Sequence, residues 1–148
     1  MTPRIPSLLA FIEGFLQSEF SFEHARALIG PFAQQRANDT EALDPFPGSN
    51  VQQAWLEKVE MSGGQVILAG IGMDFETPVA IPLDELIQRL GPAREMPRLH
   101  PTAPISFQFL LSSPSFKGYM LLSGPHGSGS PPRSITRLIL RRFPPEWV

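Results

Sequence analysis

The chain has 148 residues, 42% hydrophobic and 18% charged, a composition that indicates one globular domain and excludes a disordered chain. It contains no cysteine, which excludes disulfides, a thiolate nucleophile and a cysteine-based zinc site. The formal net charge of −2 is unevenly distributed, because residues 1–88 carry twelve acidic and four basic side chains (−8) and residues 89–148 carry two and eight (+6). Either the two parts neutralise each other, or the first part offers an acidic face to a basic partner.

The N-terminal segment predicts a helical hairpin. Apolar residues recur at three- and four-residue spacing from Ser7 to Ser18, and Ser7 is a candidate N-cap. Ser21 is expected to cap a second helix, which GlyPro at 30–31 ends. Residues 31–50 then predict one helical turn followed by a polar loop that ends in ProGlySerAsn.

The middle of the chain predicts a β-hairpin. Trp55, Val59 and Met61 alternate with polar residues, and SerGlyGly at 62–64 forms the turn. The strand that follows, GlnValIleLeuAlaGlyIleGlyMet, is apolar on both faces, so we expect it to be central in a sheet. A second turn is expected at Asp74–Pro78, before a short edge strand of sequence ValAlaIle.

The second part of the chain begins with a third predicted helix. Pro82 opens this helix, apolar residues follow at i, i+3, i+4 and i+7 from Leu83 to Leu90, and Gly91 ends it. The next segment, residues 92–104, contains four prolines and predicts an extended, stiff loop suited to contact with another molecule.

Three more strands complete the chain. Ile105–Ser112 alternates apolar and polar residues, and residues 117–124 form its hairpin partner. A Gly- and Ser-rich loop leads to the last strand, residues 134–143. One face of that strand is apolar, and the other mixes apolar and guanidinium groups, as on a surface packed within the molecule or against a partner. The first face comprises Thr136, Leu138 and Leu140, and the second Ile135, Arg137, Ile139, Arg141 and Phe143.

These elements predict an α+β fold in a single domain, residues 1–148. The fold class is an antiparallel sheet on which the N-terminal helical hairpin and a further short helix pack. The two helices that end in IleGlyPro and LeuGlyPro stand 61 positions apart, and each precedes strand-like sequence. This echo is consistent with two related halves, residues 1–81 and 82–143.

No residue pattern points to catalysis. His24, His100 and His126 are widely spaced and lack the i, i+4 pairing of helical zinc ligands. Asp84 and Glu85 are adjacent on a helix, so their carboxylates diverge rather than converge on a substrate. We therefore expect a protein that is not an enzyme and uses no cofactor or metal.

Neither a membrane nor a nucleic acid is the expected partner. No apolar run approaches the roughly 18 residues that a membrane helix needs, and no secretory signal pattern is present, so we expect a cytoplasmic protein. Arginines near the C-terminus form a candidate basic ridge, but only one aromatic side chain lies close enough in sequence to stack with bases. These residues are Arg133, Arg137, Arg141 and Arg142, with Phe143 beside them.

The order of elements, with the motifs AlaLeuIleGlyPro and GlnArgLeuGlyPro, resembles in outline the β-lactamase inhibitor protein and the related outer-membrane assembly lipoprotein fold. That resemblance implies a tandem of helix-plus-sheet units. In size, in the acidity of one part and in its lack of catalytic residues, the chain also resembles small immunity proteins. Those proteins neutralise bacterial toxins of contact-dependent and type VI secretion systems.

We therefore predict a non-enzymatic bacterial immunity or inhibitor protein that occludes a cognate toxin, with acidic residues steering a basic partner. The alternative is a secretion-system chaperone or adaptor that binds an extended segment of an effector protein. The oligomeric state is left open. The residues expected to bind the partner are Asp39, Glu41 and Asp44 in the long loop, and Asp74 and Glu76 at the strand turn.

Overall fold

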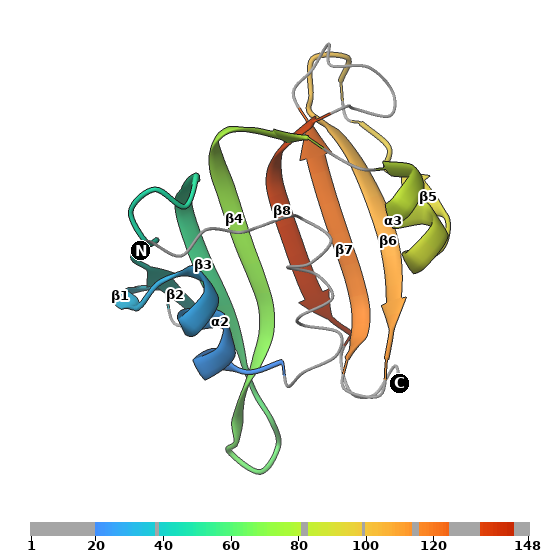
Figure 1. Ribbon diagram of the computed structural model, residues 1–148. Coiled ribbons are helices and arrows are strands. Elements are labelled where there is room, and N and C mark those ends of the chain that lie inside the picture. Colours follow the sequence, from blue (N-terminus) through green and yellow to red (C-terminus); the bar gives the residue numbers. More distant parts are fainter. Residues whose placement is uncertain are drawn as a thin grey trace.

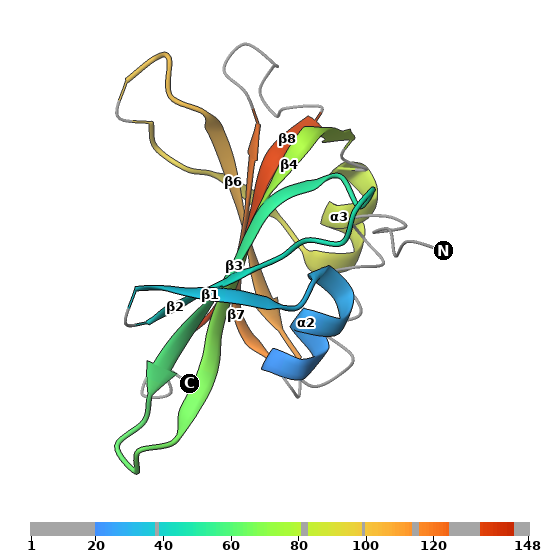
Figure 2. The ribbon, with the colours of Figure 1, turned by 90° about the vertical axis from the view of Figure 1, so that its left-hand side faces the viewer.

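The computed structural model describes residues 20–37, 39–80, 83–98, 100–113, 116–124 and 134–143. Within these ranges, eight strands form one antiparallel sheet and two helices lie on the same face of it (Figures 1 and 2). The α+β prediction is confirmed, whereas the predicted helix at Ser7–Ser18 lies outside the described residues. The elements are α2 (Phe22–Ile29), β1 (Phe32–Ala37), β2 (Thr40–Leu43), β3 (Val51–Glu60), β4 (Val66–Ala80), α3 (Leu83–Leu90), β5 (Ala93–Glu95), β6 (Ile105–Ser112), β7 (Lys117–Gly124) and β8 (Ser134–Arg142).

The strand order is β1-β2-β3-β4-β8-β7-β6-β5. Within the described residues, each part of the chain therefore contributes one helix followed by four strands, α2 with β1–β4 and α3 with β5–β8. The last strand of each part lies at the centre, where β4 and β8 pair antiparallel. This is the arrangement that two related halves would give, and a common origin for them stays a prediction.

Local sequence accounts for the limits of α2. The Ser21 hydroxyl accepts a hydrogen bond from the backbone N–H of His24 at 3.2 Å, which caps the first turn. At the other end, the N–H of Gly30 donates to the carbonyl of Arg26 at 3.0 Å. A Cβ on Gly30 would overlap the backbone carbonyl of Asp44, so glycine allows α2 to end against the chain that follows β2.

The GlyPro that ends α3 has a different physical reason. Gly91 has a φ of 99°, a conformation that favours glycine, and its N–H donates to the carbonyl of Ile87 at 2.9 Å. A Cβ on Gly91 would meet nothing within 4 Å, so conformation rather than space requires glycine here. Glycine is therefore required at the two helix ends for different reasons, for close packing at Gly30 and for a positive φ at Gly91.

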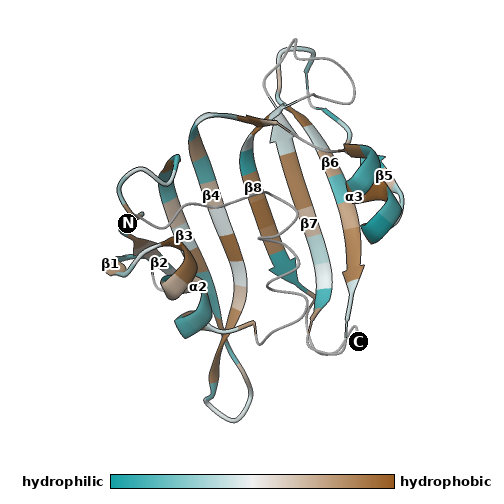
Figure 3. Cartoon of the chain, in the orientation of Figure 1, coloured by the Kyte–Doolittle hydropathy of each residue, from teal (hydrophilic) through white to brown (hydrophobic). Residues whose placement is uncertain are grey.

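The core lies between the helices and the sheet. Alternate strand residues point toward α2 and α3, and the apolar bands that they form cross the central strands (Figure 3). Burying this face against two amphipathic helices removes the apolar area from water, which is the main stabilising contribution to the fold. Fully buried members include Ile29, Leu56, Ile71, Met73, Leu86, Phe109, Met120, Leu122, Ile135 and Leu138.

The strongest sequence patterns predicted their elements correctly. The hairpin of β3 and β4 turns at residues 61–64, where the N–H of Gly64 donates to the carbonyl of Met61 at 2.8 Å. The helix α3, the β6–β7 hairpin and the strand β8 also occur where they were expected. On β8, Leu138 and Leu140 are buried and Arg137 faces away from the core, as their alternation predicted. The alternation fails at the start of the strand, where Ile135, expected on the face of Arg137, is fully buried.

Two predictions in the first part of the chain were wrong. Residues 32–37 and 40–43 form β1 and β2 rather than a helical turn and a loop, because strands at the edge of a sheet need little apolar sequence. The loop predicted to end in ProGlySerAsn is confirmed at residues 44–50. The turn expected at Asp74–Pro78 is instead part of β4, which continues to Ala80. Its pairing with β8 skips from Asp74 to Val79, and this irregularity accommodates Pro78 without ending the strand.

The proline-containing segment after α3 is also less irregular than expected. Ala93–Glu95 forms the short edge strand β5, which pairs with residues 107–109 of β6. A strand of three residues offers few free backbone groups to other chains, which limits edge-to-edge association at this side of the sheet.

Candidate functional site

The face of the sheet that points away from α2 and α3 is the candidate site. No helix of the described part of the chain lies on it (Figure 2). We call it the open face, and strand pairing places its side chains in three rows that run from β3 to β6. The first row is Glu57, Gly70, Arg141, Tyr119 and Leu110; the second is Trp55, Gly72, Ile139, Leu121 and Gln108; the third is Gln53, Asp74, Arg137, Ser123 and Ser106.

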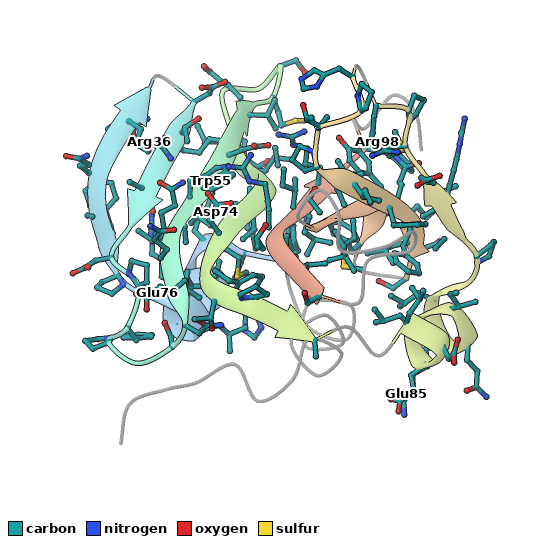
Figure 4. All side chains as sticks on the ribbon, turned by 90° about the horizontal axis from the view of Figure 1, so that it is seen from above. Arg36, Trp55, Asp74, Glu76, Glu85 and Arg98 are labelled. Carbon is teal, nitrogen blue, oxygen red and sulfur yellow. The ribbon has the colours of Figure 1, made fainter. Side chains whose placement is uncertain are left out.

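Trp55 lies across its neighbouring strand because Gly72 leaves the space. A Cβ on Gly72 would overlap the Cε2 and Cζ2 atoms of the indole, so the ring rests directly on the backbone of β4. The guanidinium of Arg36 lies 5.8 Å from the ring centroid and that of Arg137 lies 5.5 Å from it. Arg36, Trp55 and Asp74 lie together on this face, whereas Glu85 of α3 lies on the other (Figure 4).

Asp74 and Arg137 form an ion pair across the centre of the sheet. Nε and Nη2 of Arg137 donate to the two carboxylate oxygens at 2.6 and 3.0 Å, and Gln53 donates a third hydrogen bond. Partial burial alone would raise the pKa of Asp74, but the hydrogen bonds from Arg137 and Gln53 outweigh it and hold the pKa below its ordinary value of 3.8. Asp74 is therefore ionised at neutral pH and fully engaged within the chain.

A second ion pair spans β4 at the other glycine. Nε and Nη2 of Arg141 donate to the two carboxylate oxygens of Glu57, both at 2.9 Å. Glu57 and Arg141 belong to strands on either side of β4, and they meet because a Cβ on Gly70 would lie only 2.7 Å from Glu57 Oε1. The hydrogen bond with Glu57, with a smaller contribution from Tyr119, raises the pKa of Arg141 above its usual range.

Two hollows flank the Asp74–Arg137 pair. The first, which we call the Trp55 hollow, has a volume of about 400 Å³ and is lined by Arg36, Thr40, Gln53, Trp55 and Arg137. The second has a volume of about 530 Å³ and shares Arg137 with the first. Both are within the size range of ligand sites, roughly 300–1,000 Å³. The wall of the Trp55 hollow is mainly polar, whereas polar and apolar atoms contribute about equally to the wall of the second. The second hollow is lined by Gln52, Asp74, Phe75, Pro104, Ser106, Ser123, Thr136 and Arg137.

Apolar side chains dominate the other part of the open face. Leu110 is 63% exposed and pairs across the strands with Tyr119, while Leu121 pairs with Ile139. We call these four residues the apolar strip. The open face therefore combines an aromatic and charged region on β3, β4 and β8 with an apolar region on β6, β7 and β8, the two kinds of contact that protein interfaces combine.

The five acidic residues expected to bind a partner do not come together. The Glu41 side chain is only 4% exposed and points toward the core, where Nε and Nη2 of Arg26 donate to its oxygens at 2.8 and 2.7 Å. Asp74 lies on the open face, paired with Arg137. Asp39 is exposed at the β1–β2 turn, Asp44 is exposed after β2, and Glu76 is exposed on β4 (Figure 4).

The histidines do not assemble a catalytic or metal site in the part of the chain described. His24 lies in α2, and His100, in the segment before β6, has its Nδ1 2.6 Å from the Thr102 hydroxyl; His126 lies outside the described residues. Within those ranges, no group of three or more His, Cys, Asp or Glu residues is placed to hold a metal ion. None of the helices described is long and apolar enough to cross a membrane.

Sequence reasoning missed Arg36, Trp55 and Glu57 as parts of one surface. The signal for them was present in GlyIleGly, because a glycine within a strand often marks the close approach of another group. Gly70 and Gly72 open two gaps on β4, and side chains from both neighbouring strands fill them. The glycines therefore position the site, although they carry no functional group.

Comparisons of this chain with protein-family models, with characterised proteins and with solved structures gave no match.

Proposed function

We propose that the chain is a non-enzymatic binding protein whose open face covers a protein partner, and that it acts as an immunity or inhibitor protein against a bacterial toxin. The observation that carries this proposal is the position of Trp55, ordered against Gly72 and between two guanidinium groups on a face that no described helix covers. Tryptophan and arginine are the residues most enriched at the energetic centres of protein interfaces.

The composition of the open face supports protein binding. Its aromatic and arginine groups adjoin the apolar strip, so a partner would bury a continuous patch of aromatic and aliphatic area with polar groups around it. The side chains at its centre are already ordered by bidentate ion pairs and ring contacts. Ordering before binding lowers the conformational entropy that association would otherwise lose.

The acidic residues contribute to this proposal differently from what charge alone indicated. Glu57 and Asp74, from the acidic part of the chain, pair with Arg141 and Arg137 from the basic part, so the two parts partly neutralise each other. Exposed acids at the rim, such as Asp39, remain available for long-range steering of a basic surface on the partner.

The alternative function is a chaperone or adaptor that binds an extended effector segment. Addition of that segment as a further strand is disfavoured at both edges, because β1 pairs with β2 through two irregularities and β5 has only three residues. An extended segment would instead have to lie across the open face, where the apolar strip is the feature that favours it.

Co-expression with the product of the neighbouring gene tests the proposal, because toxin and immunity genes are typically adjacent. Wild-type protein is expected to restore growth of cells that express the toxin. The variant Arg36→Gln/Leu110→Ala, changed on the open face, is expected to lose protection. The variant Arg89→Gln/Leu28→Ala makes the same chemical changes on the helices and should still protect. No protection by the wild type, or equal protection by all three proteins, would overturn the proposal.

A further inference from the structure

The Trp55 hollow holds more hydrogen-bond donors than the chain itself uses. Arg36 contacts the indole ring, and within the described ranges no carboxylate lies at ion-pairing distance from it. Arg137 uses Nε and Nη2 for Asp74, and no hydrogen bond of its Nη1 occurs within the described part of the chain. Two guanidinium groups therefore border one hollow with N–H groups to spare.

The acceptor oxygens that line the hollow, by contrast, are uncharged. They are the hydroxyl of Thr40, which also donates to Asp39 at 3.2 Å, and the amide oxygen of Gln53. The carboxylate of Asp74 accepts from Arg137 through both oxygens and also from Gln53, so it is engaged within the chain. Because the charged groups that line the hollow are both guanidiniums, a ligand that brings negatively charged acceptor oxygens complements it better than a ligand that brings only donors.

We infer that the Trp55 hollow binds a carboxylate presented by the partner protein, an Asp or Glu side chain at the tip of a loop. The carboxylate would accept hydrogen bonds from Arg36 and from the Nη1 of Arg137, while apolar residues beside it cover the indole and the apolar strip. This inference rests on the proposed function and deepens it, since it gives the partner an acidic contact at the centre of the interface.

The surroundings of the hollow favour a carboxylate on a protein over the phosphates of a nucleic acid. A nucleic-acid backbone is bound by a row of cations that neutralise successive phosphates. Here Arg137 and Arg141 are already paired with Asp74 and Glu57, and the chain as a whole has a net charge of −2. Strand pairing places Ile139 and Leu121 of the apolar strip in the same row as Trp55. One acidic loop tip with apolar neighbours fits that surface.

Nuclear magnetic resonance titration of the full-length, ¹⁵N-labelled chain tests the inference without the natural partner. The probes are the blocked tripeptide Gly-Glu-Gly, its Gly-Gln-Gly analogue and inorganic phosphate. The signals followed are the indole N–H of Trp55, assigned with a Trp55→Phe variant, and the Nε–H groups of Arg36 and Arg137. The glutamate peptide is expected to shift these signals saturably, with a Kd on the order of 1–10 mM. The glutamine peptide is expected to bind at least about tenfold more weakly.

Arg36→Gln should weaken binding of the glutamate peptide by about tenfold or more, while the matched Arg89→Gln on α3 should leave it unchanged. Equal binding of the two peptides, an unaffected Arg36→Gln variant, or no saturable shift with any probe would overturn the inference. Phosphate that binds tenfold more tightly than the glutamate peptide would also overturn it and would indicate a phosphate ligand. The co-expression assay uses none of these probes, so failure here is distinguishable from failure of the proposed function.

Discussion

The two faces of the sheet are built from alternate residues of the same strands, yet they differ in how many charged side chains they carry and in how exposed those side chains are. On the covered face the buried side chains of the described strands are apolar except for Glu41 of β2, whose carboxylate is held by Arg26 of α2. On the open face, the side chains of Glu57 and Asp74 are 24% and 15% exposed and pair with Arg141 and Arg137, whereas that of Glu41 is 4% exposed.

The difference separates the residues that stabilise the fold from those available to a partner. Apolar burial on the covered face contributes stability, because it removes large side chains from water. Half-exposed ion pairs contribute little stability, since solvent screens them and each side chain loses rotamer entropy. They do hold Trp55 and its neighbours in one geometry, which is what a preorganised binding surface needs.

The largest expected effect comes from two neighbours on β8. Leu138→Ala removes a fully buried side chain from the covered face, and we expect it to lower the free energy of unfolding by about 2–5 kcal/mol. Ile139→Ala, on the open face, should lower the free energy of unfolding by no more than about 1 kcal/mol, but it should weaken binding of the partner. Urea denaturation of both variants measures the contrast. Similar losses for the two would show that the faces do not differ in this way.

The second largest effect on stability is expected from the ion pair between Glu41 and Arg26 on the covered face. Glu41→Gln removes the charge that Arg26 pairs with, in a carboxyl group that water scarcely reaches, and we expect a loss of about 1–3 kcal/mol. Chemical denaturation provides the measurement. A matched Glu76→Gln variant changes an exposed carboxylate on β4 and should stay within about 0.5 kcal/mol of the wild type. Equal effects would mean that Glu41 does not stabilise the covered face.

A methyl group at Gly72 should displace the indole. Gly72→Ala places a Cβ where the ring of Trp55 lies, so we expect altered near-ultraviolet circular dichroism and a loss of about 1–3 kcal/mol from overpacking. Gly63→Ala is the control, because a Cβ there meets nothing within 4 Å. An unchanged aromatic spectrum in Gly72→Ala would contradict the packing of Trp55 on β4.

The smallest effect concerns Asp74 and depends on pH. Its pKa is lower in the folded chain than the ordinary value of 3.8, so ionised Asp74 stabilises the fold above that pH, and the contribution is lost as the pH falls through the lowered pKa. Asp74→Asn should therefore cost about 1 kcal/mol or less at pH 7, and this cost should shrink as the pH falls below 3.8 toward the lowered pKa. Unfolding of both proteins between pH 7 and pH 2 measures this. A difference that persists unchanged at pH 2 would exclude the ion pair as its cause.

Elements with strong periodicity could be predicted from the sequence, and weakly patterned ones could not. The apolar residues of α3 recur at helical spacing and those of β6 alternate with polar residues, and each pattern predicted one buried face. The strand β1 has no such alternation, because its described side chains are exposed, and β4 continues past Pro78 only because its pairing with β8 becomes irregular there. Both features depend on neighbours in the sheet that the local sequence does not contain.

The candidate site was harder to predict for the same reason. Asp74 and Arg137 are 63 positions apart, and Glu57 and Arg141 are 84 apart, so only the order of the strands brings them together. Charge alone indicated Glu41 as a surface group, although Arg26 holds it in the covered face. The charge difference between the two parts of the chain did contain useful information, because both open-face ion pairs join an acid from the first part to an arginine from the second.

The central claim, that the partner binds the open face, is tested most directly by quantitative affinity capture with the two matched double variants. Lysate of the organism that carries the gene is passed over wild-type protein, Arg36→Gln/Leu110→Ala and Arg89→Gln/Leu28→Ala, and bound proteins are quantified by mass spectrometry. We predict that a protein enriched by the wild type is also captured by Arg89→Gln/Leu28→Ala. Its affinity for Arg36→Gln/Leu110→Ala should be at least about tenfold lower, a loss of about 1.4 kcal/mol in binding free energy, and less of it should be captured. Retention by the open-face variant with loss by the helix-side variant would contradict the account.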